Sequence, residues 1–190
     1  MIEIPSDLNP DLLPLAFLLG TWEGVGVSDF PGAEKCNFGQ SVTFSHDGRD
    51  VIEYVSHSWV LDNEGKQVRP LESESGYWRI DKDRKVEIVM VRDQGIVEIW
   101  YGELADQKPQ IDIVTDAVAR TAASGPYSGG KRLYGYVKGD LMWVGEKATP
   151  EVPLRPYMSA HLKKVVNPEE VAEMARGLGD LPDDGIAFFK

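Results

Sequence analysis

The sequence predicts an all-β protein, an antiparallel up-and-down β-barrel of about ten short strands. Runs rich in β-branched and aromatic residues recur along the chain, separated by turns of Gly, Asp, Asn and Pro, with few helical windows between them. The composition agrees, because five tryptophans and seven tyrosines in a chain of this size suit a barrel interior. A glycine-rich stretch near the N-terminus, residues 15–31, supplies the third observation.

This stretch contains the predicted first strand, and its glycines stand almost alternately. Side chains of a strand point to opposite faces in turn, so Trp22, Gly24 and Gly26 share one face. Glycine inside a strand is typical of a bend or of a close approach by a ligand or another backbone. Two interpretations therefore stay open, a strand at a barrel corner and a bare backbone that lines a cavity.

The chain is expected to contain three parts. Residues 1–12 form an extended lead-in, residues 13–166 form the barrel, and residues 167–190 form a C-terminal helix and tail. Asp11 is a candidate N-cap for one or two helical turns that stop at Gly20 and plug one end of the barrel.

The later strands are predicted from their composition and from the turns between them. Asp47-Gly48 is a strong hairpin signal between the second and third strands. The strands expected after the first cover residues 41–44, 51–61, 76–80, 86–92, 96–103, 111–121, 131–137, 140–147 and 157–166.

The C-terminal segment has the pattern of an amphipathic helix. Asn167 is an N-cap candidate, Pro168 suits the first helical position, and an apolar stripe follows at helical spacing. The apolar end of the chain at residues 186–189 is expected to dock on the barrel or on a second subunit, which makes a homodimer an open alternative.

Length, charge and cysteine content limit the classes of function that the chain can have. The chain has 190 residues, which favours one domain with a short appendage. A formal net charge of −11 disfavours nucleic acid and anionic membranes as partners. Cys36 is the single cysteine, and the N-terminus lacks the pattern of a leader peptide, so we expect a cytosolic protein.

Three histidines are the candidate metal ligands. His46 precedes a turn and is most simply an exposed turn residue. His57 lies in a strand and is most simply a half-buried structural histidine, with a pocket group as the alternative. In the last predicted strand, Tyr157, Ser159, His161 and Lys163 share one face. No second histidine stands at chelating spacing, so the one metal site that a lone histidine can support is the axial position of haem.

Four separated motifs resemble the nitrobindins, a family of ten-stranded haem-binding β-barrels similar in fold to fatty-acid-binding proteins and lipocalins. The resemblance spans residues 13–166. The motifs are Gly-x-Trp-x-Gly-x-Gly at 20–26 with Phe30-Pro31, the block 74–79 with 95–102, Arg132-x-Tyr134, and His161-Leu162.

The resemblance implies a ferric haem b protein that binds nitric oxide and isomerises peroxynitrite to nitrate. It implies that His161 ligates the iron and serves as the catalytic residue. Arg132 is expected to pair with a haem propionate. The full set of residues expected to contact the cofactor is Gly20, Trp22, Gly24, Gly26, Arg132 and His161.

Two departures from the family pattern keep an alternative open. Phe30-Pro31-Gly32 stands where haem-binding members commonly have Tyr-Pro-Thr, and residues 36–41 replace a Phe-x-Tyr-x-Glu-Glu pattern. The alternative is a haem-free barrel that binds or carries a small apolar ligand such as a fatty acid.

Overall fold

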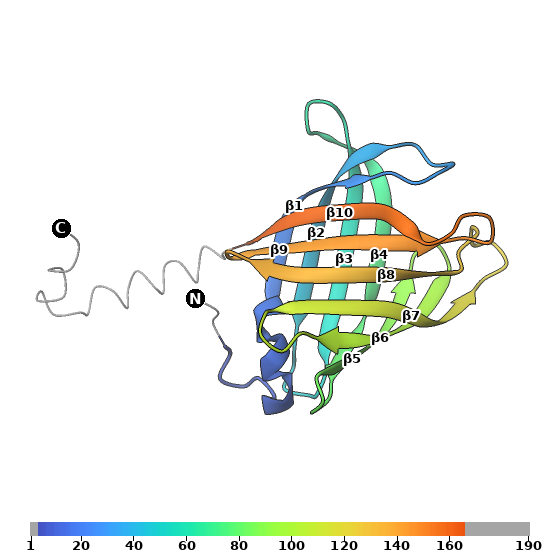
Figure 1. Cartoon of the computed structure of the whole chain (residues 1–190). Helices are drawn as coiled ribbons and strands as arrows, with labels where there is room; N and C mark the ends of the chain where they lie inside the picture. Colours follow the sequence, from blue (N-terminus) through green and yellow to red (C-terminus); the bar gives the residue numbers. More distant parts are fainter. Residues whose placement is uncertain (1–3, 166–190) are drawn as a thin grey trace, which may run out of the picture.

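The structure, a computed structural model, describes residues 4–165 and shows a closed antiparallel β-barrel (Figure 1). Each strand pairs with the next along the chain, and β1 pairs with β10 to close the barrel. The predicted ten-stranded up-and-down barrel is therefore confirmed. The predicted C-terminal helix and tail at 167–190 lie outside the described residues. No helix in the described part of the chain is long and apolar enough to cross a membrane.

One short helix precedes the ten strands. The elements are η1 (Pro10–Leu18), β1 (Gly20–Ser28), β2 (Cys36–Ser45), β3 (Ile52–Leu61), β4 (Gln67–Ile80), β5 (Lys85–Arg92), β6 (Ile96–Leu104), β7 (Gln110–Arg120), β8 (Gly129–Val137), β9 (Asp140–Ala148) and β10 (Arg155–Lys164).

The 3-10 helix η1 lies across one end of the barrel and forms the predicted plug (Figure 1). Its residues Leu12, Leu15 and Leu18 are fully buried. The N-cap is Asn9, whose side chain accepts a hydrogen bond from the backbone N–H of Asp11 at 3.0 Å. The prediction that Asp11 itself caps the helix is wrong, because the helix begins at Pro10 and its N-cap, Asn9, lies two residues before Asp11.

The glycines of β1 are explained by close packing of neighbouring strands. Trp22 points into the barrel, while Val25 on the opposite face is 60% exposed. A Cβ atom at Gly24 would collide with the carbonyl oxygen of His161 on β10. One at Gly26 would collide with the Phe38 ring. These glycines therefore allow neighbouring strands to approach closely, and this packing does not support the interpretation of a bare backbone that lines a cavity.

Aromatic side chains fill the middle of the barrel. Neighbouring ring centroids lie 5.1 to 6.2 Å apart in a group made of Phe44, Tyr54, Trp78, Tyr134 and Trp143. This spacing is typical of direct aromatic packing. A ligand therefore finds little room at the centre of the barrel.

Two strands, β2 and β4, begin much earlier than the sequence predicts, and both gain polar residues that face inward. β2 begins at Cys36 instead of residue 41 and includes the buried Gln40. β4 begins at Gln67 instead of residue 76 and includes the buried Glu74. Such segments lack apolar alternation, because their inward positions carry hydrogen-bonding groups that find partners only in the folded barrel.

Candidate functional site at the barrel mouth

The end of the barrel opposite η1, here called the mouth, is hollow. Its cavity has a volume of about 600 Å³, within the usual range for small-molecule sites. The β1–β2, β7–β8 and β9–β10 loops surround it, and the inward-facing ends of several strands form its floor. Its lining includes Phe30, Gly32, Arg69, Glu72, Arg92, Tyr127, Lys147 and Tyr157.

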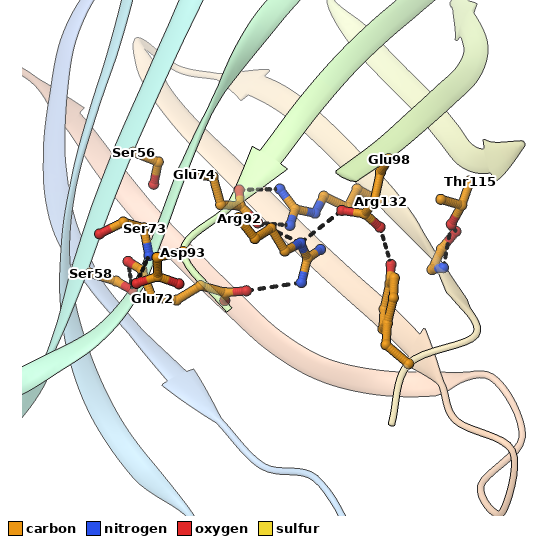
Figure 2. Close-up of polar contacts among 12 residues, drawn as sticks. Ser56, Ser58, Glu72, Ser73, Glu74, Arg92, Asp93, Glu98, Thr115 and Arg132 are labelled. Carbon is orange, nitrogen blue, oxygen red and sulfur yellow. Dashed lines mark hydrogen bonds and ion pairs between the residues drawn. The ribbon is translucent and has the colours of Figure 1, made fainter. Parts of the chain in front are cut away.

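A layer of buried charges separates this cavity from the aromatic core. Arg92 on β5 donates to Glu72 at 2.9 Å and to Glu98 at 2.7 Å, and lies 3.3 Å from Glu74 (Figure 2). Tyr127 in the β7–β8 loop donates a short hydrogen bond to Glu98. Buried charges are retained only when paired in this way, because an unpaired ion is strongly disfavoured away from water.

Arg132 on β8 completes the charged layer. Its guanidinium forms a bidentate pair with Glu74, with one Nη1–Oε2 distance of 2.8 Å (Figure 2). Tyr54 donates a further hydrogen bond to Glu74 at 3.0 Å. Burial raises the pKa of Glu74, but Arg132 and Arg92 outweigh this effect and hold that pKa at about 2. Glu74 is therefore a permanent anion at neutral pH.

Glu72 lies at the boundary between the charged layer and the cavity. Burial raises the pKa of Glu72 by more than the neighbouring Arg92 lowers it. The pKa values of the two β4 carboxyl groups therefore shift in opposite directions, because Glu74 contacts two guanidinium groups and Glu72 contacts one.

Lys147 on β9 points into the cavity between two aromatic rings. Its ammonium lies 4.3 Å from the ring centroid of Phe30 and 5.1 Å from that of Tyr157. Burial lowers the pKa of Lys147 below its ordinary value, against the opposing effect of Glu72. Among residues 4–165, no carboxylate oxygen lies within 4.0 Å of the Lys147 ammonium nitrogen, so Lys147 forms no ion pair there.

Tyr157 is buried at the mouth because β10 has a β-bulge there, with a register shift between Pro156 and Met158. Its hydroxyl lies 3.5 Å from the Nη2 atom of Arg132. Burial raises the pKa of Tyr157 to about 12, against the lowering effect of Arg132, so the side chain is a neutral phenol at physiological pH.

The turn at residues 30–33 shapes the rim of the cavity. Ala33 donates its backbone N–H to the carbonyl of Phe30 at 3.0 Å, and Gly32 has φ of +82°. Proline followed by a residue with positive φ is typical of a type II turn, which favours glycine at that position. Gly32 is therefore explained by the turn, which turns the Phe30 ring toward Lys147.

His161 lies on the outer wall of the barrel. Its β10 neighbours Ala160 and Leu162 are buried and face inward, whereas His161 pairs across the sheet with the exposed Val25 and Met142. Its side chain is 50% exposed, and its Nε2 atom lies 2.6 Å from Asp140. The structure therefore corrects the expectation that His161 faces an iron inside the barrel.

The other residues expected to bind the cofactor are also absent from the mouth. Gly20 begins β1 beside the plug, and Trp22 donates its indole N–H to the carbonyl of Leu18 in η1 at 2.7 Å. Gly24 and Gly26 face neighbouring strands, as described above. Arg132 lies below the cavity with its guanidinium engaged by Glu74, so it is not available to a propionate.

The side chains of the mouth do not fit a haem held by an axial histidine. His46 lies in the β2–β3 loop at the plug end, and His57, like His161, faces outward. The cavity instead offers two buried phenols: Tyr127 is hydrogen-bonded to Glu98, and Tyr157 has a raised pKa. No cluster of metal-binding side chains occurs within residues 4–165.

Reasoning from sequence missed the charged layer and Lys147. A signal was present, since Arg92, Glu98 and Lys147 stand in phase with the inward-facing apolar residues of their own strands. Inside the predicted strand 86–92, for example, the inward positions Val86, Ile88 and Met90 are followed by Arg92. A charge at such a position indicates a buried ion pair or a binding site.

Comparison with known proteins places these features in a family. Residues 11–164 match the family model of the THAP4-like, heme-binding beta-barrel domain. The chain belongs to this family. A ferric nitrobindin-like protein of Streptomyces griseus is 88% identical over 190 residues, which is 100% of both chains. The predicted resemblance to the nitrobindins is therefore confirmed.

Two further comparisons are with more distant proteins. A peroxynitrite isomerase of a Nocardioides species is 42% identical over 160 residues, covering 84% of this chain and 96% of that protein. The crystal structure of Rv2717c from M. tuberculosis has a TM-score of 0.76 at 24% identity, covering 84% of this chain and 99% of the other. The last comparison supports the barrel fold alone.

Proposed function

We propose that this member of the family binds a small molecule in the mouth cavity without an iron-ligating histidine. The observation that carries the proposal is the content of the cavity: about 600 Å³, walls that include two aromatic rings and a half-buried lysine, and no imidazole among its lining residues. The protein then acts as a carrier or sensor, which was the haem-free alternative from the sequence.

The position of the cavity changes the kind of ligand expected. The aromatic core and the charged layer close the barrel beneath the mouth, so a ligand stays near the rim and does not thread through the centre. A compact molecule fits this space better than a long fatty acid buried along the barrel axis.

The second candidate is the activity implied by the family: a ferric haem b protein that binds nitric oxide and converts peroxynitrite to nitrate. It is supported by the family model, whose description names heme binding, and by relatives named peroxynitrite isomerase. The direction of His161 does not support it, so the haem-free function is the stronger proposal.

A hemin titration separates the two candidates. Hemin is added to the purified full chain and to its His161→Ala variant, and the Soret region is recorded. Competition is measured against 8-anilinonaphthalene-1-sulfonate, a fluorescent probe with an aromatic body and an anionic sulfonate. We expect the probe to bind, and we expect no Soret band of a histidine-ligated ferric haem in either protein.

A Soret band that is present in the wild type and lost in His161→Ala would overturn the proposal in favour of a haem enzyme. Absence of probe binding would overturn it in another way, by showing that the mouth is not a binding site. The matched control is His57→Ala, which removes another outward-facing histidine of the barrel wall.

Two further predictions from the sequence are kept as proposals. A cytosolic location is supported by the composition, with its single cysteine, and cell fractionation tests it. The alternative of a homodimer is tested by measuring mass in solution for the full chain and for a chain shortened by residues 167–190.

A further inference from the structure

The position of Lys147 differs from that of the lysines that form ion pairs in the described part of the chain. It lies on the inward face of β9, in line with Trp143 and Gly145, and reaches the mouth cavity. Two aromatic faces contact its ammonium, and such contacts favour a cation without neutralising its charge. Lys35, Lys66, Lys85 and Lys131, in contrast, each pair with a carboxylate on the protein surface.

The other cations that line the cavity already have counter-ions. Arg92 pairs with Glu72 at 2.9 Å, and Arg69 lies 4.0 Å from Glu34. Glu151, the remaining carboxylate of the lining, lies in the exposed β9–β10 loop. Among the described residues that line the mouth, the ammonium of Lys147 is therefore the positive charge that lacks a direct partner.

A partly desolvated ammonium without a counter-ion is an anchor for an anionic group. A carboxylate at this point would gain a charge-assisted hydrogen bond in surroundings that exclude much of the water. The Phe30 and Tyr157 rings offer apolar surface beside the same position. An anion with an apolar body satisfies both features at once.

We infer that the mouth cavity binds a compact amphipathic monocarboxylate, with its carboxylate against the Lys147 ammonium and its apolar body against the Phe30 and Tyr157 rings. The inference rests on the proposed function, since it names the ligand class of the same cavity. The charged layer beneath limits the depth of the ligand, because a second buried carboxylate there would face Glu72.

Two ligands of equal shape test the inference. Calorimetric titrations compare 2-naphthoate with its neutral amide, 2-naphthamide, on the full chain at pH 7. We expect the carboxylate to bind at least about tenfold more tightly, in the range expected for one charge-assisted hydrogen bond. In Lys147→Met, which keeps an unbranched side chain of nearly the same length but removes its charge, the two affinities should become equal.

Two variants control for folding and for net charge. Lys147→Arg retains the cation and should keep most of the preference for the carboxylate. Lys131→Met removes a lysine from the neighbouring strand β8, where it pairs with Asp112 at 3.0 Å, and should leave the preference unchanged.

The outcomes separate this inference from the proposed function. Equal binding of both ligands by the wild type would overturn the role of Lys147 and leave the cavity as a binding site. A preference that persists in Lys147→Met would likewise overturn the assignment of the anchor. Binding of neither ligand by the wild type would count against the proposed function as well.

Discussion

At the plug end of the barrel, Leu12, Leu15 and Leu18 of η1 are fully buried, and the Trp22 indole is hydrogen-bonded to the helix. At the mouth, the inward positions carry Glu72, Arg92 and other charges above which a cavity remains. Apolar packing closes the plug end of the barrel. At the other end, ion pairs close the barrel beneath the mouth cavity. Apolar packing stabilises a fold efficiently, whereas buried ion pairs are weak evidence for stability and are frequent at functional sites.

The largest effect is expected where the charged layer is broken. Arg132→Met leaves Glu74 as a buried anion with only part of its compensation, so the free energy of unfolding should fall by about 3–5 kcal/mol. Urea unfolding followed by tryptophan fluorescence measures this change. The control is Lys85→Met, which breaks the exposed pair with Glu103 and should cost far less stability than Arg132→Met, because solvent screens exposed ion pairs. Equal losses in both variants would contradict the importance assigned to the layer.

A cavity in the plug should cost nearly as much stability and leave the mouth unchanged. Leu15→Ala removes fully buried methyl groups, so we expect a loss of about 2–5 kcal/mol in the free energy of unfolding. Its affinity for 2-naphthoate, measured on the folded protein, should equal that of the wild type. A large change in affinity would show that the two ends are coupled.

Acid should weaken the mouth end through Glu74. The pKa of Glu74 is about 2 in the folded protein and 4.5 for an ordinary glutamate in the unfolded chain. Its stabilising contribution is therefore complete above pH 4.5 and is lost as the pH falls toward 2. A shift of this size corresponds to about 3 kcal/mol. Glu72, with its raised pKa, acts in the opposite direction and reduces the net change.

Unfolding curves at pH 5 and pH 3 measure this dependence. The wild type should lose more stability between these values than Glu74→Gln, which has no carboxylate to protonate at that position. An identical acid dependence in the two proteins would contradict the low pKa of Glu74.

A smaller effect is expected at the rim. Gly32→Ala places a side chain at φ of +82° and should cost about 1–2 kcal/mol of stability through backbone strain alone, because no atom lies within 4 Å of the added Cβ. Gly139→Ala is the matched control, since Gly139 also has positive φ and open space but lies at the plug end. Only Gly32→Ala should also weaken binding of 2-naphthoate, which calorimetry would show.

The smallest effect is expected for His161→Ala. The exposed pair between His161 and Asp140 should contribute less than about 1 kcal/mol, and ligand binding at the mouth should not change, because the side chain points away from the barrel interior. Thermal unfolding and the naphthoate titration check both statements. A loss of binding would restore His161 as a site residue.

Much of the fold could be predicted from sequence because its signals are local. Turn residues, β-branched runs and the glycines of β1 predict the strands and their order, and short connections leave an up-and-down barrel as the simplest closure. The limits appear at β2 and β4, where Gln40, Glu72 and Glu74 interrupt the apolar pattern. Their partners Ser56, Trp143, Arg92 and Arg132 come from other strands.

The site depended on tertiary structure for two geometric reasons, the phase of the last strand and the pairing of charges across the barrel. Strict alternation along the last strand places Tyr157 and His161 on one face, and the sequence by itself determined only that alternation. The bulge after Pro156 changes the phase, so Tyr157 enters the mouth while His161 remains outside. Pairing across the barrel likewise decided which charges are neutralised, and thereby left Lys147 without a direct counter-ion beside the cavity.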